Sequence, residues 1–325
     1  MKKYIRLLLL GCAAGVFLSS AHVRAETDWP SRAIKIVSPY GAGGPNDLSA
    51  RLLGEQLSAR LGQPVVVENK VGAGTAIGNH SVATAQANGY TLLYAAAPYS
   101  TLEALNGKLS YDPDKDLVPV AKVASAPLFL IVNADSPVKT VQDLIKHGET
   151  QPEGLTMGSP GHGSLPHLAM ELFLRDAGVK GIVVQYKGDV AAYTDLLAGR
   201  LDATLTAITV ALPHIEAGKL RVLGVASEKP SAIYPEAKAL KDQGLPNVVA
   251  SGWYGFMAPA GTDAAIVDTL DKNVNEILGQ PDIKKRLLEQ GLEITAGDQA
   301  EFRRFIQSEM KKWADVIQTA GIKAQ

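Results

Sequence analysis

Residues 33–95 decide the fold class: AIKIVSPYGAGGPNDLSARLLGEQLSARLGQPVVVENKVGAGTAIGNHSVATAQANGYTLLYA. An apolar run at Ala33–Ser38 is followed at Asp47–Leu61 by leucines at helical spacing. A second apolar run, Pro64–Glu68, precedes a helical stretch at Ile77–Ala87, and Tyr90–Ala95 is a third run. Runs of this length predict strands, and the leucine spacing predicts a helix. The β-α-β-α-β order favours a parallel sheet with helices on both faces.

The same alternation continues to the end of the chain. We expect further strands at 128–132, 155–158, 182–186, 203–207, 220–226 and 253–258. Helices are expected at 138–146, 166–177, 190–198, 264–278, 281–289 and 299–320, so the chain is almost wholly helical from residue 263. Pro281 suits the first position of a helix, and Asp298 suits an N-cap. The middle of the chain therefore forms a second β/α unit.

Two candidate crossings between these units lie at Ala124–Phe129 and Ser251–Phe256. They predict one discontinuous lobe, residues 26–126 and 253–325, and a second lobe, residues 127–252. No linker rich in Pro, Gly or Ser separates the two units. The expected fold class is α/β with two lobes, each a mainly parallel sheet flanked by helices.

The first 25 residues have the pattern of a secretory signal peptide. Lys2, Lys3 and Arg6 precede the apolar run Leu7–Leu18, and Val23-Arg24-Ala25 offers small residues before a cut after Ala25. The sequence thus predicts an exported, periplasmic protein. Leu9-Leu10-Gly11-Cys12 resembles a lipobox, which leaves a lipid-anchored form as an alternative.

Composition excludes several classes of function. The formal charge of the 325-residue chain is −1, which gives no basic field for nucleic acid. Cys12 is the only cysteine, so the chain without residues 1–25 would have no disulfide, thiol nucleophile or zinc–thiolate site. No nucleotide motif fits: Gly72–Gly78 is G-x-G-x-x-x-G, not the dinucleotide fingerprint. No cofactor is expected.

Glycine gathers at four predicted strand-to-helix turns. These turns are Tyr40–Asp47, Gly72–Gly74, Ser159–Ser164 and Tyr186–Asp189. In an open α/β sheet, ligands bind at the carboxyl ends of strands, where helix N-termini offer unpaired N–H groups. Glycine lets such a backbone approach a ligand closely. Such turns are candidate sites for small anions, although glycine also serves tight turns that bind nothing.

Enzyme patterns are weak. The chain has no G-x-S-x-G elbow, so Ser159 and Ser164 are interpreted as turn or cap residues. His162 and His167, with Glu171 one helical turn beyond, are suspects as metal ligands but match no strong zinc pattern. We therefore predict no catalytic residue and no metal. A secreted hydrolase using Ser164 with His162 or His167 is kept as a rival hypothesis.

Several blocks in order resemble the substrate-binding proteins of tripartite tricarboxylate transporters, the Bug receptor family. They are PYGAGGPNDLSAR, LGQPVVVENKVGAGTAIG, NGYTLLY, SYDPDKDLVPV, GHGSLPHLAMELF, YKGD, DLLAGRLDA, GKLRVLGV, WYGFMAPAGT and EFRRFIQSEMKKW. The resemblance implies a type II-like periplasmic binding protein with two lobes that close on a small carboxylate. It also implies no catalysis and delivery of the ligand to membrane permease subunits by a monomer. A receptor that presents its ligand to a membrane sensor kinase is the alternative.

In this family, main-chain N–H groups and waters of two facing loops hold the ligand carboxylate. The resemblance maps ligand contacts to Tyr40, Gly43, Gly44, Pro45, Asn46 and Asp47, and to Ser159, Gly161, His162, Gly163 and Ser164. It places the remaining wall at Tyr186, Lys187, Asp189 and Ala207.

The chain departs from the family pattern at three places. Gly41 and Ala42 stand where two prolines are common, and Asn46 stands where threonine is common. Asp189 stands where a small neutral residue is usual. Two interpretations of Asp189 stay open: its carboxylate caps the following helix, or it points into the cleft and selects ligands with a cationic or hydrogen-donating group.

Overall fold

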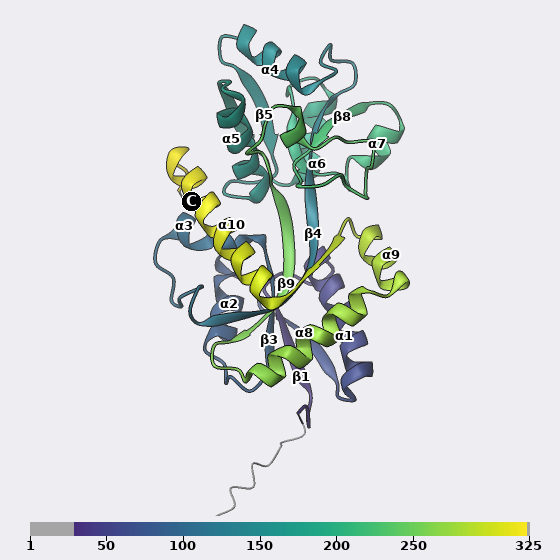
Figure 1. The fold of residues 1–325 in the computed structure, drawn as a ribbon. Coiled ribbons are helices and arrows are strands. Elements are labelled where there is room, and N and C mark those ends of the chain that lie inside the picture. The colour runs from purple at the N-terminus through teal and green to yellow at the C-terminus, as the bar shows by residue number, and fades with distance from the viewer. Residues whose placement is uncertain (1–28, 324–325) are drawn as a thin grey trace, which may run out of the picture.

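The computed structural model describes residues 29–323 as two stacked α/β parts (Figure 1). The predicted signal peptide and Cys12 lie outside the described residues. The strands are β1 Ile34–Ser38, β2 Val65–Asn69, β3 Thr91–Ala96, β4 Leu117–Asn133, β5 Leu155–Ser159, β6 Gly181–Gln185, β7 Thr204–Ala207, β8 Leu220–Val225, β9 Ser251–Pro259 and β10 Glu293–Gly297. The α-helices are α1 Pro45–Leu61, α2 Ala76–Ala83, α3 Leu102–Asn106, α4 Val141–Thr150, α5 Leu165–Ala177, α6 Asp189–Leu197, α7 Leu212–Glu216, α8 Ala264–Leu278, α9 Pro281–Glu289 and α10 Gln299–Thr319. Short 3-10 helices are η1 Ala73–Thr75, η2 Ala97–Ser100 and η3 Leu240–Gln243.

The lower part in Figure 1 is built on the sheet order β10-β4-β9-β3-β1-β2. β1 runs parallel to β2 and to β3, as the β-α-β-α-β pattern predicts. In the upper part, β7 and β8 pair with the far half of β4, and β5 pairs in parallel with β6. Strands β5, β6 and β7 run in one direction, because a parallel bridge joins Met157 of β5 to Ala203 just before β7. Their carboxyl ends therefore share one edge.

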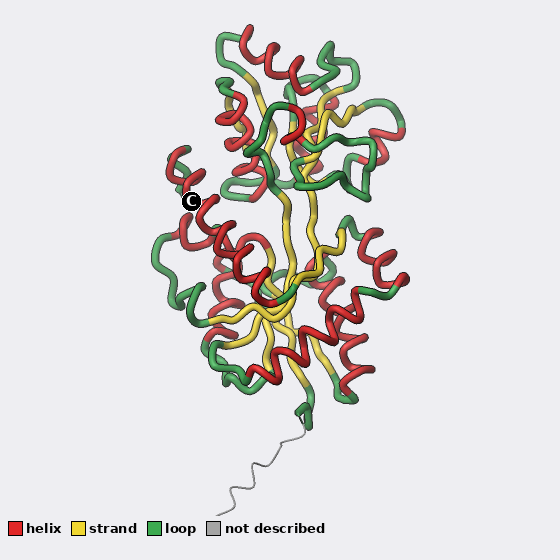
Figure 2. The backbone as a smooth tube through the Cα atoms, viewed as in Figure 1, coloured by secondary structure: helices red, strands yellow, loops and turns green. Residues whose placement is uncertain are grey.

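The long strand β4 corrects the prediction of mainly parallel sheets. It pairs antiparallel with β9 and β10 in the lower part and with β7 and β8 in the upper part, so both sheets are mixed. The sequence predicted a short strand at 128–132 and a crossing at 124–129, whereas β4 is continuous over 17 residues. A single strand that passes from one part to the other is antiparallel to a strand that returns beside it. Figure 2 shows β4 and β9 as the yellow segments that join the two parts.

Most predicted elements are confirmed, with shifted ends. Pro281 opens α9, and Asp298 caps α10, accepting a hydrogen bond from the Glu301 N–H (2.6 Å). The C-terminal region, predicted to be almost wholly helical, contains one strand that the sequence did not predict: β10 forms after α9 and pairs with β4. No helix among residues 29–323 is both long enough and apolar enough to cross a bilayer.

Hydrophobic cores lie on both faces of both sheets. In the lower part, one core packs α1 and α8 on the sheet, and another packs α2 and the first half of α10. In the upper part, one core contains α4 and α5, and the other contains α6. Trp313, Val316 and Ile317 of α10 belong to the upper core, whereas Phe302 and Ile306 belong to the lower one. Helix α10 thus packs against both parts, and the lobe limits at 126/127 and 252/253 stay a prediction.

Candidate functional site

The first candidate loop joins β1 to α1 at the carboxyl edge of β1. Gly44 is the N-cap of α1 and Pro45 its first residue, and no side chain caps the helix. Within the described part of the chain, the N–H groups of Gly44, Asn46 and Asp47 have no hydrogen-bond partner in the structure. An uncapped helix start of this kind presents unpaired donors and a partial positive charge. The loop can therefore bind an anion through its backbone.

The Asp47 carboxylate shapes this loop. It accepts hydrogen bonds from the Gly43 N–H (2.9 Å), from Asn69 Nδ2 (2.8 Å) and from Arg51 Nε (3.0 Å), and Arg51 also forms an ion pair with it. Burial alone would raise the pKa of Asp47, but these hydrogen bonds and the Arg51 charge outweigh burial and lower the pKa to about 2. Asn69 Nδ2 also donates to the Tyr40 carbonyl (3.0 Å). We call this the Asp47–Arg51–Asn69 clamp.

Two side chains of the first loop bond to the protein. The Asp47 carboxylate is 2% exposed, and the expected contact of Asp47 with a ligand through the main chain of the loop stays a prediction. Asn46 accepts from Ser38 Oγ (2.7 Å) and donates to the Tyr94 carbonyl (3.1 Å), so its amide also faces inward. Only the backbone of these two residues remains available to a ligand.

Three tyrosines lie in or next to the loop: Tyr40 belongs to it, the Tyr94 carbonyl accepts from Asn46, and Tyr254 is close to both. Tyr94 stacks with Tyr254 at a ring-centroid distance of 6.0 Å. Burial, followed by the nearby Tyr254, raises the pKa of the Tyr40 hydroxyl well above its usual value. Burial also raises the pKa of Tyr254 to about 12. Burial raises the pKa of Tyr94 too, so all three hydroxyls are neutral at physiological pH and contribute no anionic charge at the first loop.

The second candidate loop joins β5 to α5. Ser164 caps α5, with its Oγ accepting from the His167 N–H (3.3 Å) and donating to the Gly161 carbonyl (2.6 Å). The Gly161 N–H donates to Ser159 Oγ (3.3 Å), and the Ser164 N–H donates to the Gly161 carbonyl (3.2 Å). The Gly163 N–H donates to His167 Nδ1 (3.0 Å). Three of the four N–H groups from Gly161 to Ser164 are thus already engaged.

His162 is the exception in this loop. Its main-chain N–H has no partner among residues 29–323, while its ring Nε2 lies 2.7 Å from the Lys323 carbonyl. The positive φ of Gly163 (+68°) turns the backbone between His162 and the helix. Sequence reasoning missed His167 as a partner of this loop, because its bond to Gly163 depends on the loop conformation.

The third candidate segment consists of the β6–α6 turn and the end of β7. The Gly188 N–H donates to the Pro160 carbonyl and the Tyr186 N–H to the Ser159 carbonyl, both at 2.8 Å, which places this turn beside the second loop. The Tyr186 hydroxyl donates to Asp195 (2.7 Å); burial and this bond raise the pKa of Tyr186 to about 12. Lys187 is exposed. Ala207 ends β7, and its carbonyl accepts from the Tyr193 hydroxyl (3.1 Å).

Asp189 does not act as the helix cap that one interpretation expected. It is the first residue of α6, the N-cap is Gly188, and no side chain caps this helix. Instead, Asp189 Oδ1 accepts a hydrogen bond from Thr206 Oγ1 at 2.7 Å. The carboxylate is therefore held against β7 rather than turned back to the helix backbone.

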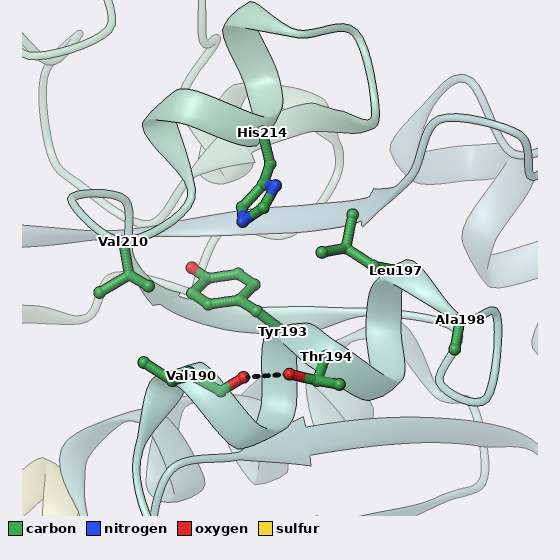
Figure 3. A pocket seen from close by; sticks show the side chains of 7 residues that line it. All are labelled: Val190, Tyr193, Thr194, Leu197, Ala198, Val210 and His214. Carbon is green, nitrogen blue, oxygen red and sulfur yellow. Dashed lines mark hydrogen bonds between the residues drawn. The ribbon is translucent and has the colours of Figure 1, made fainter.

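An apolar groove lies beside α6 (Figure 3). Its volume is about 380 Å³, and it lies between α6 and α7. Val190, Tyr193, Leu197, Val210 and His214 line it, together with Thr194 and Ala198. None of its lining residues belongs to either candidate loop, so the groove is distinct from both loops.

No catalytic set emerges in the described residues. The Ser164 hydroxyl is engaged as a cap, and His167 Nδ1 accepts from Gly163, so neither provides a nucleophile–base pair. His167 Nε2 lies 3.7 Å from Glu171, and no group of three or more metal-binding side chains gathers within residues 29–323. The geometry offers backbone donors and one anchored carboxylate, which suits binding rather than bond cleavage.

The sequence profile described as "Tripartite tricarboxylate transporter family receptor" matches residues 49–322. Protein BugT of Bordetella pertussis is 34% identical over 314 residues, covering 95% of this chain and 96% of that protein. The structure of R. palustris Rpa4515 with adipate is 33% identical, with a TM-score of 0.74 over 91% of this chain and 99% of that one. The malate-bound MatC of Rhodopseudomonas palustris is 30% identical, with a TM-score of 0.70 over 89% of this chain and 99% of that one.

Proposed function

The chain belongs to the tripartite tricarboxylate transporter receptor family, and we propose that it captures a small organic carboxylate between its two glycine-containing loops. Membership confirms the resemblance drawn from the sequence blocks. It also confirms the α/β periplasmic binding protein fold and the class of receptor rather than enzyme. The loops named above are our proposal for the place of capture.

The observation that carries the proposal is the uncapped start of α1. Gly44 and Asn46 present unpaired N–H groups, while the one arginine nearby, Arg51, is engaged by Asp47. Capture must then rest on backbone donors and the helix dipole. One helix terminus contributes about 0.3–1 kcal/mol when exposed and up to ~2 kcal/mol when partly buried. A micromolar constant needs about −8 kcal/mol. Donors from both loops, together with apolar contacts, are therefore required.

The ligand class follows from this arrangement and from relatives. Rpa4515 was solved with adipate and MatC with malate, which are small acids with two carboxylates. Backbone N–H groups bind a carboxylate without contacting the rest of the ligand. We infer that this chain also binds an organic acid with at least one carboxylate, and that other residues select among such acids.

Delivery of the ligand completes the proposal. We propose that the exported chain acts as a periplasmic monomer and presents its ligand to permease subunits of a tripartite tricarboxylate-type transporter. The lobes, residues 26–126 with 253–325 and residues 127–252, would close on the ligand by rotation about β4 and β9. Presentation to a membrane sensor kinase would use the same site and differs only in the downstream partner.

Position 44 allows a direct test of backbone capture. Gly44 has φ −82°, which proline can adopt, so Gly44→Pro removes one N–H with little change of backbone. Gly44→Ala keeps the N–H, and its Cβ would meet nothing nearer than the Gly41 carbonyl oxygen at 3.9 Å. Any acid that co-purifies is identified by mass spectrometry, and binding of that acid, adipate and malate is measured by calorimetry. We expect Gly44→Pro to weaken binding tenfold or more and Gly44→Ala less than twofold. Equal affinity in both variants would refute capture at this loop.

A further inference from the structure

The carboxylate of Asp189 is anchored but has no cationic partner. Its Oδ1 accepts from the hydroxyl of Thr206, a residue only 2% exposed. No ion pair involves Asp189 within residues 29–323. The carboxylates of Asp47 and Asp195, in contrast, are each paired with an arginine, Arg51 and Arg200. Among residues 29–323, the carboxylate of Asp189 therefore has the Thr206 hydroxyl and the partial positive charge at the start of α6 beside it, but no cationic side chain paired with it.

Asp189 lies at the sheet edge that carries the second loop. The preceding Gly188 donates to Pro160 of the second loop, and Thr206 is the penultimate residue of β7. Because β5, β6 and β7 share their direction, the second loop, the start of α6 and the end of β7 lie at one edge. That edge approaches the lower part, since a Cβ on Gly163 of the second loop would lie 3.3 Å from Leu105 Cδ1 of α3.

We propose that Asp189 is the specificity-determining residue of the site and selects acids that carry an ammonium or hydroxyl group, against acids with a second carboxylate. The inference rests on the proposed function. Closing the cleft over Asp189 would bury its charge, and a buried charge is costly unless a partner satisfies it. An ammonium or hydroxyl group on the ligand supplies that partner. A second ligand carboxylate would instead repel Asp189 in a poorly screened cleft.

Thr206 makes this selection directional. Its hydrogen bond occupies Oδ1 and fixes the side chain, which leaves Oδ2 without a partner in the structure and free to accept from a ligand. A carboxylate fixed in this way loses little side-chain freedom on binding, which is the physical basis of preorganisation. Thr206 is thus a positioning residue for Asp189.

Matched acids of equal chain length provide the test. Adipate and 6-aminohexanoate differ only in whether the far end is a carboxylate or an ammonium group, and succinate, 4-aminobutanoate and 4-hydroxybutanoate form a shorter set. Calorimetry measures the dissociation constant of each acid. We expect wild-type protein to bind the amino or hydroxy acid of its preferred length at least tenfold more tightly than the matching diacid.

Asp189→Asn removes the charge and keeps an oxygen that can accept from Thr206. We expect the preference for the amino acid over the diacid to fall at least tenfold in this variant. Glu216→Gln is the matched control, because it makes the same charge change at an exposed position at the far end of α7. This control should leave the preference unchanged, and thermal melting verifies that both variants fold.

The outcomes separate this inference from the proposed function. A wild type that binds diacids as tightly as amino or hydroxy acids, or an unchanged preference in Asp189→Asn, would overturn the role of Asp189 alone. A wild type that binds none of these acids would instead overturn capture of small carboxylates, and the specificity argument with it.

Discussion

Replacing Asp47 by asparagine should destabilise the protein in a pH-dependent way. Two donors approach each carboxylate oxygen: the Gly43 N–H and Arg51 Nε reach Oδ2, while Asn69 Nδ2 and an Arg51 amino group reach Oδ1. An amide places an NH₂ group against one of these pairs of donors, so at least two hydrogen bonds are lost. The loop that carries Gly44 would lose its anchor.

The magnitude follows from the pKa of Asp47. The folded value is about 2, below the unfolded value of about 3.9. The charge therefore contributes stability that is fully present above about pH 4 and is lost as the pH falls through about 2. A shift of almost two pKa units corresponds to about 2.5 kcal/mol, and the half-exposed Arg51 reduces this to about 2 kcal/mol through solvent screening.

Urea unfolding at pH 7, 5, 4 and 3 measures this contribution. We expect wild type to exceed Asp47→Asn by about 2 kcal/mol at pH 7, and by about half as much at pH 3. Glu55→Gln, an exposed position on the same helix, controls for the change in net charge and should alter stability by less than about 0.5 kcal/mol. A difference between wild type and Asp47→Asn that stays constant from pH 7 to pH 3 would refute the clamp.

Three further predictions concern the loop, the hinge and the last helix. Gly163→Val should weaken binding of the co-purifying acid tenfold or more, because φ is +68° and a Cβ would press on Leu105, whereas Gly161→Ala has open space and should bind normally in calorimetry. Small-angle scattering should show a smaller radius of gyration with saturating acid, and an identical radius would favour a preformed site. Trp313→Ala should cost about 3–5 kcal/mol in urea unfolding, since the side chain is fully buried in the upper core; a loss under 1 kcal/mol would contradict that packing.

The strands and helices of residues 33–95 could be predicted because local patterns determine them. Apolar runs and leucine spacing report which face is buried, whatever the partner. The first half of β4 could not be predicted in this way, because Pro119 and Pro127 argue against a strand interior. The structure tolerates Pro119 beside a shift of register against β9, and Pro127 lies where β4 exchanges β9 for β7.

The candidate site was predictable as a place but not as a set of contacts. Glycines after strands predicted which turns lie at the sheet edge. The partners of individual N–H groups depend on residues brought in by the fold, such as Asn69 from β2 and His167 from α5. One sequence signal pointed towards the clamp: Asn69 is a polar residue at the end of β2, the strand that pairs with β1. For Asp189 the sequence left two interpretations. The Thr206 bond argues against the helix cap, and the contact with ligand stays a proposal.

The packing of α10 against both parts has a consequence for when the protein folds. Neither the lower core around Phe302 nor the upper core around Trp313 is complete until α10 has been synthesised. Domains that are contiguous in sequence fold as they emerge from the ribosome, one after the other. Here the helix that closes both cores comes last among the described elements, so the nascent chain can complete neither core before α10, Gln299–Thr319, has been made. Such a delay would suit the export proposed above, because a chain without a finished core can still be threaded through a narrow channel.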